Sequence, residues 1–246
     1  MQSNSKNRVI DETRVVTYMC EMLEDKWVVN GESIKFSAEG ELLDGQHRLM
    51  ACIEAKVPFT SVVVRGVAST AFTTIDVGKT RTNADIFHIA GFADQNNVAA
   101  IASISHSYEN GYVTLKNIGA KRALPKQQLL SWAEERRDRL IECNRFASSM
   151  NPKFMSRSML GALRYLFGKR SHAAAEAFLT SLCTGEGLLR VNPAYVLRER
   201  LIANASNRDK MPRAVMMAYC IIAWNKFRAD EEIKALKLSE TFPKIR

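Results

Sequence analysis

Long apolar runs are absent from this sequence. No stretch approaches the roughly 18 apolar residues that a membrane-spanning helix needs, so we expect no membrane partner. The N-terminal segment, Met1 to Arg8, is polar and lacks the apolar stretch of a secretory signal. Together these two absences predict a cytoplasmic protein.

Closely spaced cysteine pairs are also absent. The five cysteines lie at positions 20, 52, 143, 183 and 220, and no two of them form a Cys-x-x-Cys pair. Zinc sites and disulfide frameworks both depend on such spacing, so we expect neither and assign no metal ligand. The cysteines are instead predicted to be scattered reduced thiols in the protein core.

Excess positive charge is missing from the first third of the chain and abundant afterwards. Residues 1–90 contain 10 Lys and Arg against 12 Asp and Glu, whereas residues 91–246 contain 25 against 14. The net charge of +9 therefore comes entirely from the second part. A basic surface binds nucleic acid because binding releases counterions, so we predict DNA as a partner. The alternative is a solvated surface that only keeps the protein soluble.

Strand-like segments occur only in the first third. Residues 33–36 and 41–43 are expected to form two short strands, and the β-branched residues 60–65 a third strand that Gly66 ends. Helices are expected at residues 11–25 and between the second and third strands, ending near Lys56. The later helices are predicted at residues 83–90, 95–109, 125–149 with a break, 156–168, 172–183, 193–205 and 212–228.

This order of elements predicts the α+β fold class. A small mixed α/β domain is expected at residues 11–85, followed by a basic, all-helical domain at residues 86–246, while residues 1–10 are expected to be disordered. A homodimer formed through the helical domain is an open alternative to a monomer, although no heptad pattern supports it.

The segment Asp44-Gly45-Gln46-His47-Arg48 is the most informative in the chain. It joins a short apolar strand to a helical pattern, and the first N–H groups of such a helix form an anion site that Gly45 lets a ligand approach. Arg48 places a cation in the first turn, where the helix dipole disfavours it. His47 is suited to donating to a phosphate oxygen or transferring a proton. The structural alternative makes Asp44 the N-cap and Arg48 its i+4 ion-pair partner.

A second polar loop spans residues 76–82 and contains Gly78-Lys79-Thr80. It is not a Walker A loop, because the upstream glycine that this motif requires is missing. Thr82 and Asp85 instead resemble a capping box that begins the next helix. Lys79 and Arg81 would then supply two cations to a bound phosphate, although an ordinary charged surface loop is the alternative.

The stretch from Trp27 to about Thr82 resembles the ParB/sulfiredoxin-like superfamily, and especially phage and bacterial ParB-like nuclease-domain proteins. The residues that carry the resemblance are Trp27, Asn30-Gly31, Ile34, Phe36, Asp44 to Arg48, Ala51, Pro58, Val62 to Gly66, Phe72, Ile75-Asp76, Gly78-Lys79 and Arg81-Thr82. The remainder shows a looser likeness to the helical tails of the phage proteins. For a phage-encoded protein, the expected location is the cytoplasm of the bacterial host.

The resemblance implies a shared phosphate-binding turn but no single reaction. Sulfiredoxins have a cysteine in the turn where this chain has Gln46, so a sulfinic-acid reductase is not expected. Chromosome-segregation ParB proteins bind CTP through two adjacent arginines, where this chain has His47-Arg48. Kinases of this fold use an added acidic base, for which Asp76 and Glu54 are candidates.

The resulting prediction is a DNA-binding ParB-like protein with a nucleoside triphosphate and Mg²⁺ as expected ligands. The first alternative is a Mg²⁺-dependent nuclease or an ATP-dependent phosphotransferase, and the second is a phage interaction protein without nucleotide chemistry. The nucleotide or phosphate ligands are predicted to be Gly45, Gln46, His47, Arg48, Lys79, Thr80 and Arg81. The catalytic candidates are Asp44, His47, Arg48 and Asp76. Nucleic-acid contacts are assigned to Lys121, Arg122, Arg157, Arg164, Lys169 and Arg170.

Overall fold

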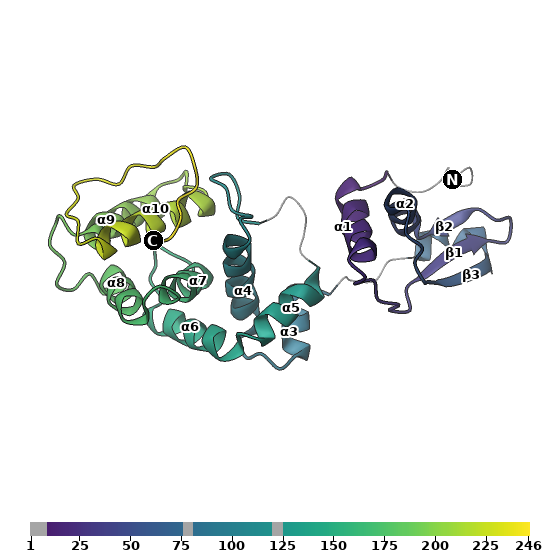
Figure 1. Ribbon diagram of the computed structural model, residues 1–246, viewed down its shortest axis with the longest axis horizontal. Coiled ribbons are helices and arrows are strands. Elements are labelled where there is room, and N and C mark those ends of the chain that lie inside the picture. Colours follow the sequence, from purple (N-terminus) through teal and green to yellow (C-terminus); the bar gives the residue numbers. More distant parts are fainter. Residues whose placement is uncertain (1–8, 76–80, 120–124) are drawn as a thin grey trace. The chain divides into compact units, whose positions relative to one another are not determined.

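The computed structural model describes residues 9–75, 81–119 and 125–246 (Figure 1). These residues form two compact units: unit 1 contains residues 9–75, and unit 2 contains residues 81–119 and 125–246. All the strands lie in unit 1, and unit 2 is built from helices. The mixed α/β composition predicted from the sequence is therefore confirmed. Most of the N-terminal segment expected to be disordered lies outside the described residues.

Unit 1 contains a three-stranded sheet and two α-helices: α1 precedes the strands in the chain, and α2 lies between the second and third strands. Its strand order is β2-β1-β3, with β1 antiparallel to β2 and parallel to β3. The elements in chain order are α1 (Glu12–Leu23), β1 (Ser33–Ser37), β2 (Leu42–Asp44), α2 (Gln46–Ala55), β3 (Val62–Val67) and the 3₁₀ helix η1 (Ser69–Thr74). The predicted strands and helices of this unit are all found, within one or two residues at most ends.

The small core of unit 1 lies between α1 and α2. Val15 and Met22 of α1 and Ala51 of α2 are buried together. Trp27, which follows α1, packs edge-on against Tyr18, and its Nε1–H donates to the carbonyl of Thr60 over 2.8 Å. This hydrogen bond fixes the chain immediately before β3.

The sequence analysis expected Gly66 to end the third strand, and this prediction is wrong. The strand continues to Val67, and Gly66 lies within it at a φ of +76°. The pairing register with β1 shifts at this point, since Lys35 pairs with Val64 and Ser37 with Val67. The glycine therefore permits a bulge inside the strand, because few other residues adopt a positive φ.

Unit 2 contains eight helices in its described residues. They are α3 (Asn83–Ile89), α4 (Gln95–Glu109), α5 (Lys126–Glu134), α6 (Arg137–Met150), α7 (Arg157–Gly168), α8 (His172–Thr184), α9 (Pro193–Ser206) and α10 (Arg213–Arg228). All the predicted helices are found, including the break in the 125–149 segment. The segment between α4 and α5 contains one isolated bridge, between Val113 and Ile118.

Helix α7 is central to unit 2, since every residue from 159 to 167 is buried and the helix packs against α4, α6, α8 and α10. Gly161 allows α4 to come close, because a Cβ atom there would lie 2.4 Å from Cδ1 of Ile101. At the other end, the ring of Phe167 stacks on that of Trp224 at 4.5 Å.

The C-terminal segment after α10 has no helix or strand but is held against unit 2. Leu236 and Ile245 are buried, and the N–H of Ile245 donates to the hydroxyl of Tyr108 over 2.7 Å. Because both apolar and hydrogen-bonded contacts anchor it, this segment is part of the folded unit.

The cysteines agree with the prediction of unpaired thiols, but only two of the five lie in the core, since Cys20, Cys52 and Cys183 are half-buried. All five lie in the described part of the chain and none forms a disulfide, while Cys143 and Cys220 are buried. Burial raises the pKa of the Cys143 thiol to about 12. Among the described residues, no helix is long and apolar enough to cross a lipid bilayer.

Candidate functional site

The predicted turn joins β2 directly to α2. Gly45 is the N-cap of α2 and has φ +100° and ψ 8°, a conformation that favours glycine. A Cβ atom at this position would lie 3.0 Å from Cγ1 and 3.3 Å from Cα of Ile34 in β1. The glycine is therefore needed for close packing against the neighbouring strand, whereas the sequence analysis explained it by the approach of a ligand.

Asp44 is not the N-cap of α2, so that part of the structural alternative is wrong. It is the last residue of β2, and its Oδ2 lies 2.8 Å from Nζ of Lys35. The predicted i+4 pair is present, with Nη2 of Arg48 at 3.6 Å from the same oxygen. The Asp44 carboxylate thus forms ion pairs with both Lys35 and Arg48 at the end of β2.

Arg48 is almost completely buried. Its residue exposure is 7%, and Nη2 donates to the carbonyl of Ser33 over 3.0 Å. Its Nη1 is also buried but has no hydrogen-bond partner among the described residues. A buried N–H of a charged group without an acceptor is costly, and such groups are rare in folded proteins. The turn therefore contains a cationic donor that an anion would satisfy.

His47 is buried as well, with 6% exposure. Its Nε2 accepts a hydrogen bond of 3.0 Å from the backbone N–H of Asp11, at the start of α1. An accepting nitrogen carries no proton, so in this arrangement Nε2 neither donates to a phosphate nor transfers a proton. The contact also places the beginning of α1 over the turn, which the sequence analysis did not foresee.

The second predicted loop is only partly described. Asp76, Lys79 and Thr80 lie outside the described residues, so their assigned roles stay predictions. Arg81 lies in unit 2, whereas the turn lies in unit 1, and its assignment to the phosphate site also stays a prediction. The capping box is confirmed: the N–H of Asp85 donates to Oγ1 of Thr82, and the N–H of Thr82 donates to the Asp85 carboxylate over 2.7 Å.

Arg164 does not lie on a nucleic-acid-binding surface, so this assignment is wrong. Its side chain is only 3% exposed, and Nη2 lies 3.1 Å from Glu176 and 3.3 Å from Glu142. His172 completes the cluster, and its hydrogen bond lowers the pKa of the Glu142 carboxyl. Burial of this arginine is tolerated because carboxylates from α6 and α8 neutralise it.

The other predicted nucleic-acid contacts differ in accessibility. Lys121 and Arg122 lie outside the described residues. Arg157 is 46% exposed and lies 3.5 Å from Asp94, and Lys169 is 48% exposed beside Glu109. Arg170 is exposed but donates to the carbonyl of Ile245 over 3.4 Å. Each of these three exposed side chains would have to exchange its present partner for a phosphate in order to contact nucleic acid.

Several further arginines stabilise the ends of neighbouring helices. Arg137 donates to the carbonyl of Ala90 over 2.7 Å at the end of α3, and Arg139 to that of Tyr165 near the end of α7. Arg198 donates to the carbonyls of Leu182 and Cys183 at the end of α8. A cation at a helix C-terminus is favourable, so part of the basic excess of unit 2 is structural. No sequence spacing identifies these arginines, because their partners are remote in the chain.

The loop between α9 and α10 carries the clearest exposed basic group. Arg208, Lys210 and Arg213 are all exposed, and none of them has an ion pair within the described ranges. Oδ1 of the buried Asn204 accepts a 2.7 Å hydrogen bond from the N–H of Met211, which fixes the end of this loop. These three residues are not among the nucleic-acid contacts that the sequence analysis assigned.

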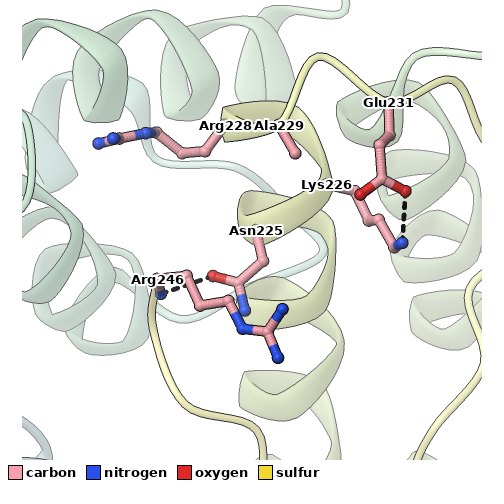
Figure 2. Close-up of a pocket in the computed structure, with 6 residues that line it drawn as sticks. All are labelled: Asn225, Lys226, Arg228, Ala229, Glu231 and Arg246. Atoms are coloured by element: carbon pink, nitrogen blue, oxygen red, sulfur yellow. Dashed lines mark hydrogen bonds and ion pairs between the residues drawn. The ribbon is translucent and has the colours of Figure 1, made fainter.

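A cavity of about 250 Å³ lies beside the end of α10 (Figure 2). Two of its polar groups are engaged: Asn225 bonds the backbone of Lys244 and Arg246, and Lys226 pairs with Glu231 at 2.5 Å. All of its lining residues belong to unit 2. Its lining residues are Asn225, Lys226, Arg228, Ala229, Glu231 and Arg246. In the described ranges, no group of three or more His, Cys, Asp or Glu residues is arranged to hold a metal ion.

Comparisons with known proteins found no relative of this chain: no family model, no curated protein and no solved structure matches it.

Proposed function

We propose that this protein binds DNA through unit 2. We also propose that it binds a phosphate group, such as that of a nucleoside triphosphate, at the turn between β2 and α2. The phosphate-binding proposal rests on the buried guanidinium of Arg48, whose Nη1 has no acceptor among the described residues. A phosphate oxygen would satisfy this donor with a charge-assisted hydrogen bond.

The surroundings of Arg48 suit an anion. Arg48 belongs to the first turn of α2, where the positive end of the helix dipole also favours an anion. Lys35 brings a second cation to the same carboxylate, Asp44. In the proposal, Asp44 positions the two cations rather than acting as a base, because its Oδ2 is already paired with both.

The burial of Arg48 implies that the ligand enters only when the cover of the turn moves. The start of α1 contacts the turn through the hydrogen bond from Asp11 to His47, in addition to the contacts that the turn makes with β1. Phosphate binding and this contact are therefore expected to compete. The same movement would free Nε2 of His47 from the Asp11 N–H, and this nitrogen could then donate to the ligand once it takes up a proton.

Nucleotide binding is tested by thermal stabilisation with ATP, CTP, GTP and UTP in the presence of Mg²⁺. A ligand at 100 times its Kd adds about 2.7 kcal/mol to the free energy of unfolding, so the shift in Tm is readily measured. We expect one or more nucleotides to stabilise the wild type but not Arg48→Ala. Arg14→Ala removes an exposed arginine from the same unit and is the matched control, which keeps the response. The nucleotide site is refuted if no nucleotide shifts the Tm of the wild type.

DNA binding is tested separately by fluorescence anisotropy over a range of salt concentrations. Each lost phosphate contact lowers the slope of log K against log salt by about one. We expect the combined Arg208→Ala, Lys210→Ala and Arg213→Ala variant to lower the slope by about two to three. A control that removes the exposed Lys234 and Lys237 is expected to change it little. Equal effects of the two variants would show that the contact is unspecific charge attraction rather than a defined surface.

A further inference from the structure

Strand β3 forms an exposed edge of the sheet in unit 1. It pairs with β1 on one side, and none of the described residues pairs with it on the other (Figure 1). Val62, Val63 and Val64 are 45%, 50% and 39% exposed. Successive residues of a strand point to opposite faces, so these three valines leave both faces of the strand uncovered.

Along Val62 to Val64 this edge lacks most of the features that normally prevent strands from pairing between molecules, and the bulge at Gly66 lies beyond these three residues. Proline, inward-facing charges and covering helices serve this purpose in other sheets. Here the strand contains no proline, and its one charged residue is Arg65, whose guanidinium lies 4.8 Å over the ring of Phe36. A β-branched strand with one charge is a template for another strand.

We propose that β3 pairs with β3 of a second copy of this chain, in antiparallel orientation about a two-fold axis at Val63. The two sheets would join into one six-stranded sheet, and each subunit would present the same surface to the other, as a two-fold dimer requires. With the axis at Val63, Val62 lies opposite Val64 of the second copy and Val63 lies opposite Val63, so the three consecutive valines meet valines.

The same register matches charges across the interface. Arg65 lies opposite Ser61 of the second copy, and Ser61 neighbours Glu32, because its Oγ donates to the Glu32 carbonyl over 3.4 Å. Ser33 pairs with Val62, which places Glu32 beside Ser61 in one row of the sheet. Arg65 of each copy therefore lies in one row with Glu32 of the other, with Ser61 between them. The pair forms when the guanidinium turns from Phe36 of its own chain toward the second copy, and the symmetry makes this pair twice. No like charges meet along the strand.

This contact is expected to be weak by itself. A pair of short strands covers less than the roughly 1,200 Å² that standard stable interfaces bury, so a dissociation constant on the order of tens of micromolar is expected. The dimer does not depend on the phosphate site, since no residue of the turn lies on β3.

The experiment is sedimentation equilibrium of the full chain from about 1 µM to about 500 µM, which spans the expected dissociation constant. Val63→Lys places two ammonium groups against each other at the axis, and we expect it to remain monomeric throughout. Ile53→Lys is the matched control, because Ile53 is 56% exposed but lies on α2, and it is expected to dimerise as the wild type does. Circular dichroism checks that both variants fold.

Charge reversal tests the register. Glu32→Lys and Arg65→Glu each create two repulsive pairs and are expected to weaken the dimer on the order of tenfold. The double variant restores opposite charges and is expected to recover most of the wild-type affinity. A wild type that stays monomeric at every concentration overturns the proposal and leaves the edge to a strand of another protein. A dimer that survives Val63→Lys, or a double variant without recovery, also overturns it.

Discussion

Replacing Gly45 by alanine tests whether the turn depends on close packing against β1. The residue adopts φ +100°, which an alanine adopts only at a cost of about 1–2 kcal/mol. The new Cβ would also lie 3.0 Å from Cγ1 and 3.3 Å from Cα of Ile34. The Cα belongs to the middle strand of the sheet, so the backbone has little freedom to move away.

Overpacking of this kind costs about a further 1–3 kcal/mol, so we expect Gly45→Ala to destabilise unit 1 by about 2–4 kcal/mol. Gly40→Ala provides the matched control. Gly40 has a similar φ of +85°, but no atom lies within 4 Å of the added Cβ. Gly40→Ala therefore loses only the free energy that the positive φ costs an alanine. The difference in stability between the two variants measures the cost of the contact with Ile34.

The assay must report on unit 1 alone, because a chain with two compact units need not unfold in one step. Hydrogen exchange of the amides in β1 and α2 provides the local free energy of opening. We expect Gly45→Ala to exchange faster than Gly40→Ala in both elements. Equal exchange rates in the two variants would refute the reasoning, since the close approach would then have no energetic consequence.

Three further predictions concern unit 2. Gly161→Ala is expected to destabilise the unit by about 1–3 kcal/mol, because its Cβ would overlap Ile101, and denaturant unfolding measures this loss. Tyr108→Phe leaves a backbone N–H of the C-terminal segment without its acceptor, so we expect a loss of about 1–3 kcal/mol and faster proteolysis of that segment. The Glu142 carboxyl has a pKa lowered below its ordinary value of 4.5 by His172, so its contribution to stability is present above that value and is lost as the pH falls through the folded-state pKa. Glu142→Gln is therefore expected to weaken the acid dependence of the free energy of unfolding.

Each of these predictions has a control. Ile101→Val removes the nearest atom and should relieve part of the cost of Gly161→Ala, so two additive losses would contradict the steric explanation. Tyr112→Phe removes a hydroxyl from a half-exposed ring, and a loss as large as that of Tyr108→Phe would argue against the hydrogen bond. Identical pH profiles for the wild type and Glu142→Gln would exclude a role for the pair with His172.

Much of the secondary structure follows from short-range patterns. The capping box of Thr82 and Asp85 and the proline at the start of α9 use groups only a few residues apart, so the helix starts could be predicted. The turn between β2 and α2 could be located in the same way. Gly66 shows the limit, because a glycine with positive φ either ends a strand or forms a bulge, and only the pairing partner decides between them.

The roles of individual charged residues could not be predicted in this way. Arg157 and Arg164 lie in one helix and look alike in the sequence, but one is half-exposed and the other is buried between carboxylates of two other helices. The arginines at the ends of α3, α7 and α8 are likewise defined by carbonyl groups far away in the chain. A net charge therefore overstates the surface available for DNA.

By itself, the sequence determined the mixed α/β composition, the extents of most helices and strands, and the position of the turn, because these depend on local periodicity and capping. The tertiary structure decided what the residues of the turn contact: Ile34 against Gly45, Asp11 over His47, and Ser33 bonded to Arg48. It also decided that β3 is an edge strand without a partner on its outer side in the described part of the chain. These features depend on contacts between segments far apart in the chain, and such contacts leave no pattern in the order of the residues.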